Sequence, residues 1–481
     1  MTPAKDISPP THPQKQETSP DVLIITYYWP PSGGAGVQRF LKFVKYFREF
    51  GVNPIVLTCA NPTYPITDHT LADDIPEDVA VFRARSIEPF RIYSLFTGTT
   101  PEKAANPSTV LGSGKLGPAS RLVRWIRANV FVPDARLGWL PFAKRRALRL
   151  VKEYDITTVI TTGPPHSTHF AGKWLRRKAG VRWIADFRDP WTDIHYNRML
   201  PRTAWIRSRD ERLERSVLNS ADEVTVTAPG TARYFQQKVS RTYHTITNGF
   251  DPDDFADAPA EKGAPRPVRQ DSAASAASAA SAASAASDKQ TVADPFVIRH
   301  VGTISESSVP SRLLEALAQL PATPYRMEFI GPVHAELERQ IADLGLDDRV
   351  AILPHVPHRE ATALMQHADL NVVVVQRSDD SRILIPGKLY DYLAAGKPVL
   401  AIGPVDGDTA SIIRDCRIGK TFDYDDADGP GQWIRTLQQE KQNPGRNPSF
   451  SPDEHAIARY SRKELTRALC NIIHPPKNVQ S

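Results

Sequence analysis

The sequence has 481 residues, 41% of them hydrophobic, and a formal net charge of +6. A chain of this length and apolar content can bury two cores, so two domains are expected. No apolar run reaches the roughly 18 residues of a membrane-spanning helix, and no zinc-finger, RRM or helix-turn-helix pattern suggests nucleic-acid binding. The cysteines Cys59, Cys416 and Cys470 lie far apart in different predicted elements. They predict neither a disulfide framework nor a zinc site, which fits a reducing cytosol.

The chain is predicted to open as a Rossmann-type unit. Residues 1–20 are polar and proline-rich, which predicts a disordered N-terminus that is neither a signal peptide nor an anchor. Residues 22–28 (VLIITYY) form the first predicted strand, followed by WPPSGGAG and an amphipathic helix. Gly33 and Gly34 present no side chain before the helix N-terminus, so a phosphate or sugar could approach the backbone there. A plain tight turn is the alternative.

Residues 121–149, from Arg121 to Arg149, contain eight cations interleaved with aromatic and aliphatic side chains. Such a segment could bind an anionic lipid surface. An equally good interpretation is a solvated basic helix face whose aromatic residues belong to the core. The cations are Arg121, Arg124, Arg127, Arg136, Lys144, Arg145, Arg146 and Arg149, and the large apolar residues are Trp125, Ile126, Phe131, Trp139 and Phe142.

Polar residues follow two further predicted strands of this domain. The strand at residues 155–162 is followed by GPPHS, which contains His166, and the strand at residues 183–187 is followed by RDPW. Open α/β sheets bind ligands at the carboxyl ends of their strands. In DFRDPW, Asp186 and Asp189 flank Arg188, which would hold both carboxylates ionised. As alternatives, Asp189 could belong to a simple turn and His166 could cap a helix.

The composition changes after the segment TITNGFDPDDF, which is predicted to complete the first domain. Its aspartates, Asp251, Asp253 and Asp254, are better explained as a solvated turn than as a metal site. Residues 256–292 are rich in Ala, Ser and Pro and contain five tandem Ser-Ala-Ala units at 272–286. This composition cannot form a core and predicts an interdomain linker.

The second domain again alternates strands with helices and contains the segment IPGKLYDYLAAGKPVLA. The apolar run 370–375 predicts a buried parallel strand, and the helix after it should begin near Pro386 and end at Gly396. Lys388 and Asp391 lie three residues apart at the helix N-terminus, where Lys388 suits a phosphate and Asp391 suits ribose hydroxyls. An ordinary solvated ion pair is the alternative.

PGKLYDYLAAGKPVLA resembles the donor-site motif of retaining GT-B glycosyltransferases of family four, in which the acid on this helix binds the ribose of the nucleotide. That acid is Asp391 here instead of the usual Glu, and the family's other acid, eight residues upstream, falls on Ile383. Gly302 and Arg312 resemble the first loop of the family's donor domain, where a basic residue meets the diphosphate.

The N-terminal domain carries a matching resemblance. YYWPPSGGAGVQR, which contains Gly33 and Gly34, resembles the family's N-terminal loop facing the cleft, and TGPPHS with His166 belongs to the same group of loops. ADFRDPWTD resembles a bacterial branch that carries this motif where many relatives have a catalytic histidine. The resemblance therefore assigns the catalytic role to Asp186, Arg188 or Asp189.

The resemblance implies a GT-B fold, with two Rossmann-like α/β domains facing each other across a cleft. The expected boundaries are residues 21–255 for the acceptor side, 293–447 for the donor side, and 448–481 for a helix that returns to the first domain.

The implied reaction transfers a sugar, with retention, from a UDP- or GDP-sugar to a glycan or polyprenyl-pyrophosphate-linked acceptor in bacterial cell-surface polysaccharide synthesis. It needs no tightly bound cofactor and no metal held by the protein. The expected location is the cytoplasm, peripherally at the inner face of the plasma membrane. A nucleotide-sugar epimerase of the same fold and a catalytically silent nucleotide-sugar binding protein are the alternatives.

Overall fold

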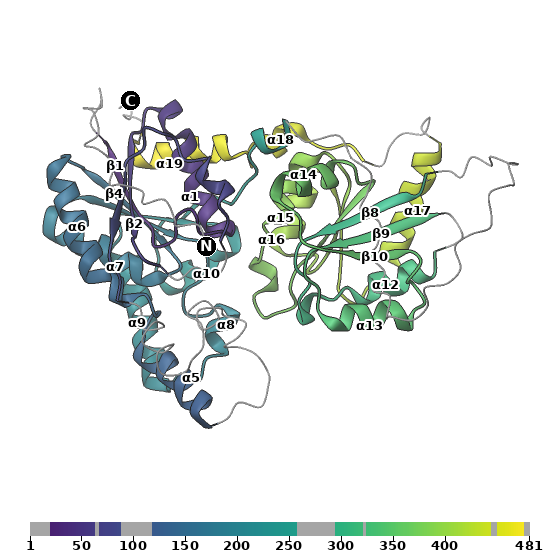
Figure 1. The fold of residues 1–481 in the computed structure, drawn as a ribbon, viewed down its shortest axis with the longest axis horizontal. Coiled ribbons are helices and arrows are strands. Elements are labelled where there is room, and N and C mark those ends of the chain that lie inside the picture. Colours follow the sequence, from purple (N-terminus) through teal and green to yellow (C-terminus); the bar gives the residue numbers. More distant parts are fainter. Residues whose placement is uncertain are drawn as a thin grey trace, which may run out of the picture. The chain divides into compact units, whose positions relative to one another are not determined.

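The computed structural model of the protein describes residues 20–62, 67–87, 118–256, 294–320, 324–443 and 450–475 (Figure 1). Except for Pro20 and Ala256, the expected disordered N-terminus (1–20) and linker (256–292) lie outside these ranges. The chain divides into two compact units, Met1–Asn248 with Arg462–Ser481, and Gly249–Ser461. Each unit is built on one parallel sheet with helices on both faces, as the alternation of strands and helices predicts.

The first unit has a seven-stranded sheet in the order β3-β2-β1-β4-β5-β6-β7. Strand β1 is flanked by β2 and β4, so the strand order reverses there, which is where doubly wound sheets bind ligands. The strands are β1 (Val22–Ile25), β2 (Pro54–Cys59), β3 (Val81–Ala84), β4 (Thr158–Gly163), β5 (Arg182–Phe187), β6 (Glu223–Val226) and β7 (His244–Thr245). The helices are α1 (Ala35–Tyr46), α5 (Pro118–Val130), α6 (Leu140–Glu153), α7 (His169–Ala179), α8 (His195–Arg198), α9 (Ala204–Ser220), α10 (Pro229–Lys238) and α19 (Arg462–Ile473).

Strand β1 is buried on both faces, which explains its unbroken apolar sequence. Its side chains alternate, so that Val22 and Ile24 join one core and Leu23 and Ile25 join the other. The first core contains apolar side chains of α1 and α19, and the second contains those of α6 and α7. The sheet is therefore covered on both sides.

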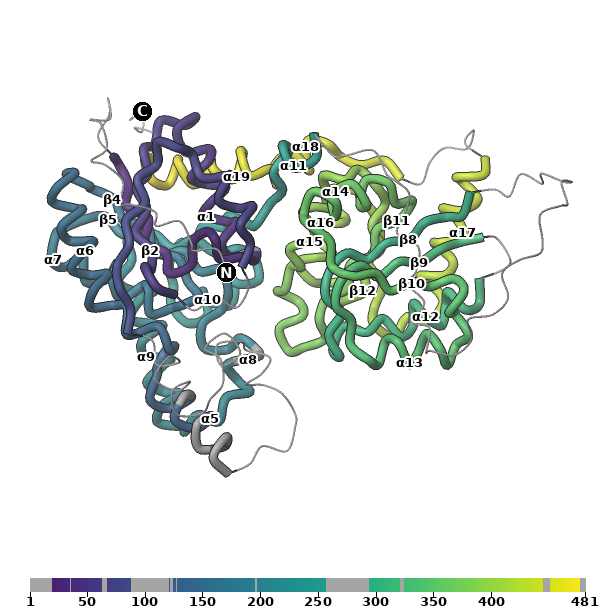
Figure 2. The backbone as a smooth tube through the Cα atoms, in the orientation of Figure 1, coloured from purple at the N-terminus to yellow at the C-terminus, as the bar shows by residue number. Residues whose placement is uncertain are grey.

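Helix α19 belongs to the first unit although it follows the whole second unit in sequence. Leu465 and Leu469 of α19 join the core that contains Phe40 of α1, and Figure 2 shows the two helices side by side. Arg182 at the start of β5 donates a hydrogen bond to the carbonyl oxygen of Ile473, with a distance of 3.1 Å. The residues that return to the first unit start at Arg462, whereas the sequence analysis placed the start of this segment at residue 448.

The second unit has a six-stranded sheet in the order β10-β9-β8-β11-β12-β13. Helices α12, α13 and α17 cover one face, and α14, α15 and α16 cover the other. The strands are β8 (Phe296–Val301), β9 (Tyr325–Ile330), β10 (Val350–Leu353), β11 (Leu370–Val374), β12 (Val399–Ile402) and β13 (Gly419–Phe422). The helices are α11 (Asp253–Ala256), α12 (Ser311–Ala318), α13 (Ala335–Asp343), α14 (His358–Gln366), α15 (Lys388–Ala395), α16 (Asp408–Asp415), α17 (Gly429–Gln442) and α18 (Glu454–Ala458).

The segment around Phe250 lies in the second unit, whereas the sequence analysis assigned it to the first domain, up to residue 255. The Phe250 ring is buried in the core formed by α14, α15 and α16, and its backbone pairs with the chain near Ser461. The amide of Phe250 donates to the carbonyl oxygen of Tyr460 at 3.1 Å. Burial of this aromatic side chain explains the shift of the boundary to Asn248.

Candidate active site

In the second unit, Gly302 and Lys388 meet at the carboxyl end of β8. Gly302 has a φ of 147°, and a Cβ atom built on it would lie 3.5 Å from His300 Nε2 and 4.0 Å from Lys388 Cγ. Lys388 is the first residue of α15, which ends at the left-handed Gly396. The opposite face of the helix, including Leu389 and Leu393, is buried in the core. This packing leaves Lys388 beside the open side of Gly302.

Lys388 and Asp391 form an ion pair with an Nζ–Oδ2 distance of 3.3 Å, and their side chains are 36% and 16% exposed. His358 at the start of α14 also belongs to this charged cluster. Its Nε2 lies 3.2 Å from Asp254 Oδ2, and this hydrogen bond raises the pKa of His358, helped by the nearby charge of Asp391 and opposed by that of Lys388. The sequence did not predict this contact between His358 and Asp254, because the two residues are distant in sequence.

Arg312 lies apart from this cluster. Its side chain is 45% exposed and pairs with Glu315 on its own helix, with an N–O distance of 2.6 Å. Among the contacts of the described residues, none joins Arg312 to Gly302, Lys388 or Asp391. Ile383, at the position of the family's first acid, is partly buried in a short 3₁₀ turn (Ser381–Ile383). The geometry therefore favours Lys388 over Arg312 as the cation for a diphosphate.

In the first unit, Asp186 is a buried residue of β5 whose two carboxylate oxygens are both engaged. Arg39 of α1 approaches Oδ1 at 2.8 Å and Oδ2 at 3.3 Å. Thr225 donates to Oδ1 at 2.7 Å and Thr162 donates to Oδ2 at 2.8 Å. Burial by itself would raise the pKa of Asp186, but Arg39 and these hydroxyl bonds lower it overall. Asp186 thus ties α1, β4, β5 and β6 together, a structural arrangement where the sequence analysis expected a catalytic acid.

Arg188 connects two loops that are predicted site segments. Its Nε donates to the carbonyl oxygen of Gly163 at 3.2 Å, and its Nη2 donates to that of Pro164. A Cβ atom on Gly36 would lie only 2.0 Å from Arg188 Nη1, so the guanidinium in its present position packs against the bare backbone of this glycine in α1. Gly34, with a φ of 99°, precedes the helix, and the neighbouring Gly33 is partly exposed. The glycine loop and the GPPHS loop therefore meet at Arg188. The next residue in the sequence, Asp189, is half-buried.

His166 is buried and does not cap a helix, since residue Thr168 precedes α7 and makes no side-chain capping bond. Its ring stacks on Trp191 with centroids 5.1 Å apart and an interplanar angle of 3°. Neither ring nitrogen has a hydrogen-bond partner in the described part of the chain. Burial holds the pKa of His166 well below its usual value, with a further contribution from His169. His166 is therefore a neutral ring held beside Gly163.

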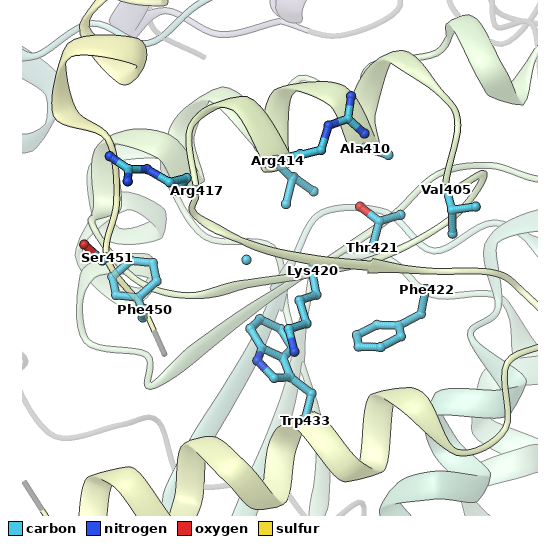
Figure 3. A pocket seen from close by; sticks show the side chains of 12 residues that line it. Val405, Ala410, Arg414, Arg417, Lys420, Thr421, Phe422, Trp433, Phe450 and Ser451 are labelled. Carbon is cyan, nitrogen blue, oxygen red and sulfur yellow. The ribbon is translucent and has the colours of Figure 1, made fainter. Parts of the chain in front are cut away.

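A cavity of about 510 Å³ lies elsewhere in the second unit, between α16, β13 and α17 (Figure 3). Arg414, Lys420 and Trp433 line it, and Lys420 Nζ lies 5.8 Å from the centroid of the Trp433 ring. Its lining contains neither Gly302, Lys388 nor Asp391, so it is separate from the charged cluster.

Within the described residues, no group of three or more His, Cys, Asp or Glu side chains is placed to hold a metal, and no helix is long and apolar enough to cross a membrane.

Comparison with known proteins decides the family. Residues 95–249 match the glycosyl transferase 4-like domain, and residues 284–428 match the glycosyl transferases group 1. The chain is a group 1 glycosyltransferase. The predicted family and enzyme class are confirmed, and a glycosyltransferase of this family depends on a nucleotide-sugar. No curated protein matches the full sequence.

Solved structures with low sequence identity to this glycosyltransferase share its fold. HepE from Anabaena, crystallised in complex with UDP, is 16% identical and matches over 94% of this chain and 99% of its own, with a TM-score of 0.59. A glycosyltransferase from Rickettsia africae is 13% identical over 95% and 98% of the two chains, with a TM-score of 0.56. Sucrose-phosphate synthase from Thermosynechococcus elongatus is 16% identical over 94% of each chain, with a TM-score of 0.53. The predicted GT-B fold with two Rossmann-like domains is confirmed.

Proposed function

We propose that this glycosyltransferase moves a sugar, with retention, from a UDP- or GDP-sugar to a glycan or polyprenyl-pyrophosphate-linked acceptor. The product would belong to a bacterial cell-surface polysaccharide or a related glycan. The observation that carries the donor half is the position of Lys388 and Asp391 beside Gly302 at the N-terminus of α15. HepE, which shares the fold, has been crystallised with UDP-glucose, which supports a UDP-sugar as the first donor to test.

The chemical demand of the reaction matches this cluster. Breaking the bond between the sugar and the diphosphate leaves negative charge on the phosphate oxygens, and a fixed cation stabilises that charge. Lys388 Nζ would bind the diphosphate in place of its present partner Asp391, which would then accept from the ribose hydroxyls. Water must be kept from competing with the acceptor, as in other transferases that close around their substrates.

For the acceptor half, we propose Arg188 as the leading catalytic residue, followed by its neighbour Asp189. Both oxygens of Asp186 already have partners, whereas Arg188 lies where the glycine loop and the GPPHS loop meet. The acceptor surface would be shaped by the residues beside this junction, which are Gly33, Gly34 and His166. An arginine here would stabilise charge on the reacting groups and would not act as a general base.

One experiment separates transfer from the alternatives. The protein is incubated with radiolabelled UDP-glucose, UDP-galactose or GDP-mannose and with a bacterial membrane extract, and the label is followed into the lipid fraction. Label in a lipid-linked product is the expected result. A free isomerised nucleotide-sugar would instead identify an epimerase, and binding without turnover would identify a silent binding protein.

We further propose that the protein binds the inner face of the plasma membrane peripherally, through a smaller surface than the segment from Arg121 to Arg149. Trp139 and Arg136 of that segment are buried, and Arg136 bonds the hydroxyl of Tyr28 at 3.1 Å. Five of the exposed large apolar side chains instead lie on α5, on the chain that leads into α9 and in the first turn of α9. We call this the α5 patch, and it consists of Trp125, Ile126, Val130, Met199 and Trp205.

The two parts of the α5 patch are joined directly. Arg124 donates to the carbonyl oxygen of Met199 at 3.1 Å, and Asn129 donates to that of Pro201 at 2.9 Å. Trp125 and Trp205 are 46% and 64% exposed. The exposed Arg121, Arg207 and Arg209 lie on the same two helices and supply the positive charge that suits anionic lipid.

Vesicle co-sedimentation tests the α5 patch. The protein should pellet with phosphatidylglycerol vesicles and much less with phosphatidylcholine vesicles, and the double variant Trp125→Ala/Trp205→Ala should stay in the supernatant. Trp174→Ala, a change in an aromatic residue of α7 outside the patch, is the control. Equal pelleting of both variants would contradict the assignment of the patch.

A further inference from the structure

His300 is a buried histidine of β8 whose proton position is set by the neighbouring strand. His300 comes two residues before Gly302 in the sequence, and only 7% of its surface is exposed. Nδ1 lies 3.0 Å from the carbonyl oxygen of Val372 in β11. Because a carbonyl oxygen can only accept a hydrogen bond, Nδ1 must carry a proton. Burial lowers the pKa of His300 to about 4, so the ring is neutral and its Nε2 carries a lone pair.

This lone pair has no hydrogen-bond donor among the described residues. A buried acceptor without a donor destabilises the folded protein, and such groups are uncommon. Nε2 faces the open side of Gly302, where an added Cβ atom would lie 3.5 Å from it and 4.0 Å from Lys388 Cγ. The unpartnered acceptor therefore lies beside the cation of the proposed donor site.

The chemistry of Nε2 limits which part of a nucleotide-sugar it can bind. Diphosphate oxygens are acceptors at neutral pH and offer no proton to a second acceptor. The ribose hydroxyls are assigned to Asp391 in the proposed function. The N–H donors of the base lie beyond the ribose, away from the diphosphate that Lys388 would bind, so the remaining donors near Nε2 are the hydroxyls of the transferred sugar. A neutral imidazole nitrogen held in one tautomer is suited to accept from one such hydroxyl.

We propose that His300 Nε2 accepts a hydrogen bond from a hydroxyl of the transferred sugar and so helps to select the donor. This inference rests on the proposed function of the site around Lys388. Val372 fixes the ring before the ligand arrives, so little reorganisation is needed on binding. A site with a buried acceptor also rejects a sugar that lacks the matching hydroxyl, since the acceptor would then stay unpaired.

His300→Asn is the test variant, because an asparagine amide can still donate to Val372 while nothing replaces Nε2. The affinities for UDP and UDP-glucose are measured by calorimetry at neutral pH for each protein. We expect unchanged UDP binding and a loss of about three- to tenfold for UDP-glucose, the range expected of one neutral hydrogen bond. His300→Gln, which can place an amide oxygen near the position of Nε2, should recover part of the loss.

His367→Gln is the matched control. Its Nδ1 also lies close to a backbone carbonyl oxygen, that of Ala363 at 2.7 Å, but the residue is exposed at the end of α14. Both affinities should stay at the wild-type values. Equal weakening of UDP and UDP-glucose in His300→Asn, or no change in either, would overturn the proposal.

Lys388→Ala distinguishes failure of this inference from failure of the proposed site. If Lys388→Ala weakens UDP binding while His300→Asn affects neither ligand, the donor site stands and the role of His300 is wrong. If Lys388→Ala leaves UDP binding unchanged, the proposed donor site itself is wrong. Should the wild-type protein bind neither UDP nor UDP-glucose, the same comparison is made with GDP and GDP-mannose, and failure of both pairs overturns both proposals.

Discussion

Two ion pairs, one in each unit, differ in how far their charges remain available to a ligand. The side chains of Arg39 and Asp186 are 1% and 2% exposed, and the remaining acceptor capacity of the carboxylate is taken up by threonine hydroxyls. Lys388 and Asp391 are partly open to solvent and lie at a helix N-terminus. The first arrangement holds elements together, whereas in the proposed donor site the second pair would exchange its internal contact for contacts with the substrate.

Replacement of Lys388 by alanine should therefore impair catalysis without unfolding the protein. Loss of a charge-assisted contact to phosphate costs about 1.5–3 kcal/mol, which corresponds to a roughly ten- to hundredfold lower kcat/KM. The measurement is steady-state transfer from the labelled donor. Lys420→Ala, which removes a cation from the separate cavity of the same unit, should leave kcat/KM near the wild-type value.

Asp186→Asn should act mainly on stability. The substitution leaves the buried Arg39 without its countercharge, which typically costs about 3–5 kcal/mol in the free energy of unfolding. Urea denaturation at neutral pH measures this loss. The control is Asp425→Asn, in an exposed pair with Arg377, where a change below about 1 kcal/mol is expected.

The pH dependence adds a second criterion for Asp186. The pKa of Asp186 is lowered in the folded state. Its contribution to the free energy of unfolding is therefore fully present above the unfolded carboxyl pKa of about 3.9, and it disappears as the pH falls through the pKa of the folded state. Wild type and Asp186→Asn should accordingly become similar in stability in acid. A difference that persists at low pH would show that the lost interaction is not electrostatic.

His166 should make the protein less stable on mild acidification. The pKa of His166 in the folded protein lies well below the unfolded value of about 6.5. The neutral ring therefore makes its full contribution to the free energy of unfolding above about pH 6.5, and this contribution is lost as the pH falls below that value. His166→Phe keeps a flat ring against Trp191 but cannot be protonated. The variant should lose less unfolding free energy than wild type between about pH 7 and pH 5.

At the scale of single elements, the sequence predicted what depends on local pattern. Helix α15 lies where Pro386 and Gly396 predicted it, and β11 (Leu370–Val374) lies within the apolar run 370–375 that predicted a buried strand. The local sequence pattern could not predict contacts between residues that are far apart in the chain. Arg39 binds Asp186, 147 positions further along the chain, and Val372 fixes the ring of His300, 72 positions before it. The pattern also identified Phe250 as apolar without telling which of the two sheets would bury it.

Helix α19 offers a test of how far the first unit depends on a distant segment. Leu469→Ala should lower the free energy of unfolding by about 2–5 kcal/mol, because the leucine is buried against the core that contains α1. Urea denaturation followed by tryptophan fluorescence measures the change. Arg467→Ala, on the exposed face of the same helix, should cost far less, and similar losses for both variants would contradict this packing.

At the scale of the whole molecule, the Ser-Ala-Ala repeat is predicted to be dispensable. Deletion of residues 272–286 removes no side chain capable of forming a core, and a change in loop length costs only about 0.6 kcal/mol per doubling. The shortened protein should unfold at nearly the wild-type temperature and retain transfer activity. Loss of folding on this deletion would mean that the repeat is a packed element.

The chain passes from the first unit to the second after Asn248 and returns at Arg462. On the ribosome, every residue of the second unit is thus synthesised before α19 exists. The unit that starts first is completed last, and until then the apolar surface of α1 that α19 covers has no partner. Newly made chains consequently pass through a stage in which the second unit is complete while the first unit still exposes part of its core, and chaperones would be expected to recognise that surface.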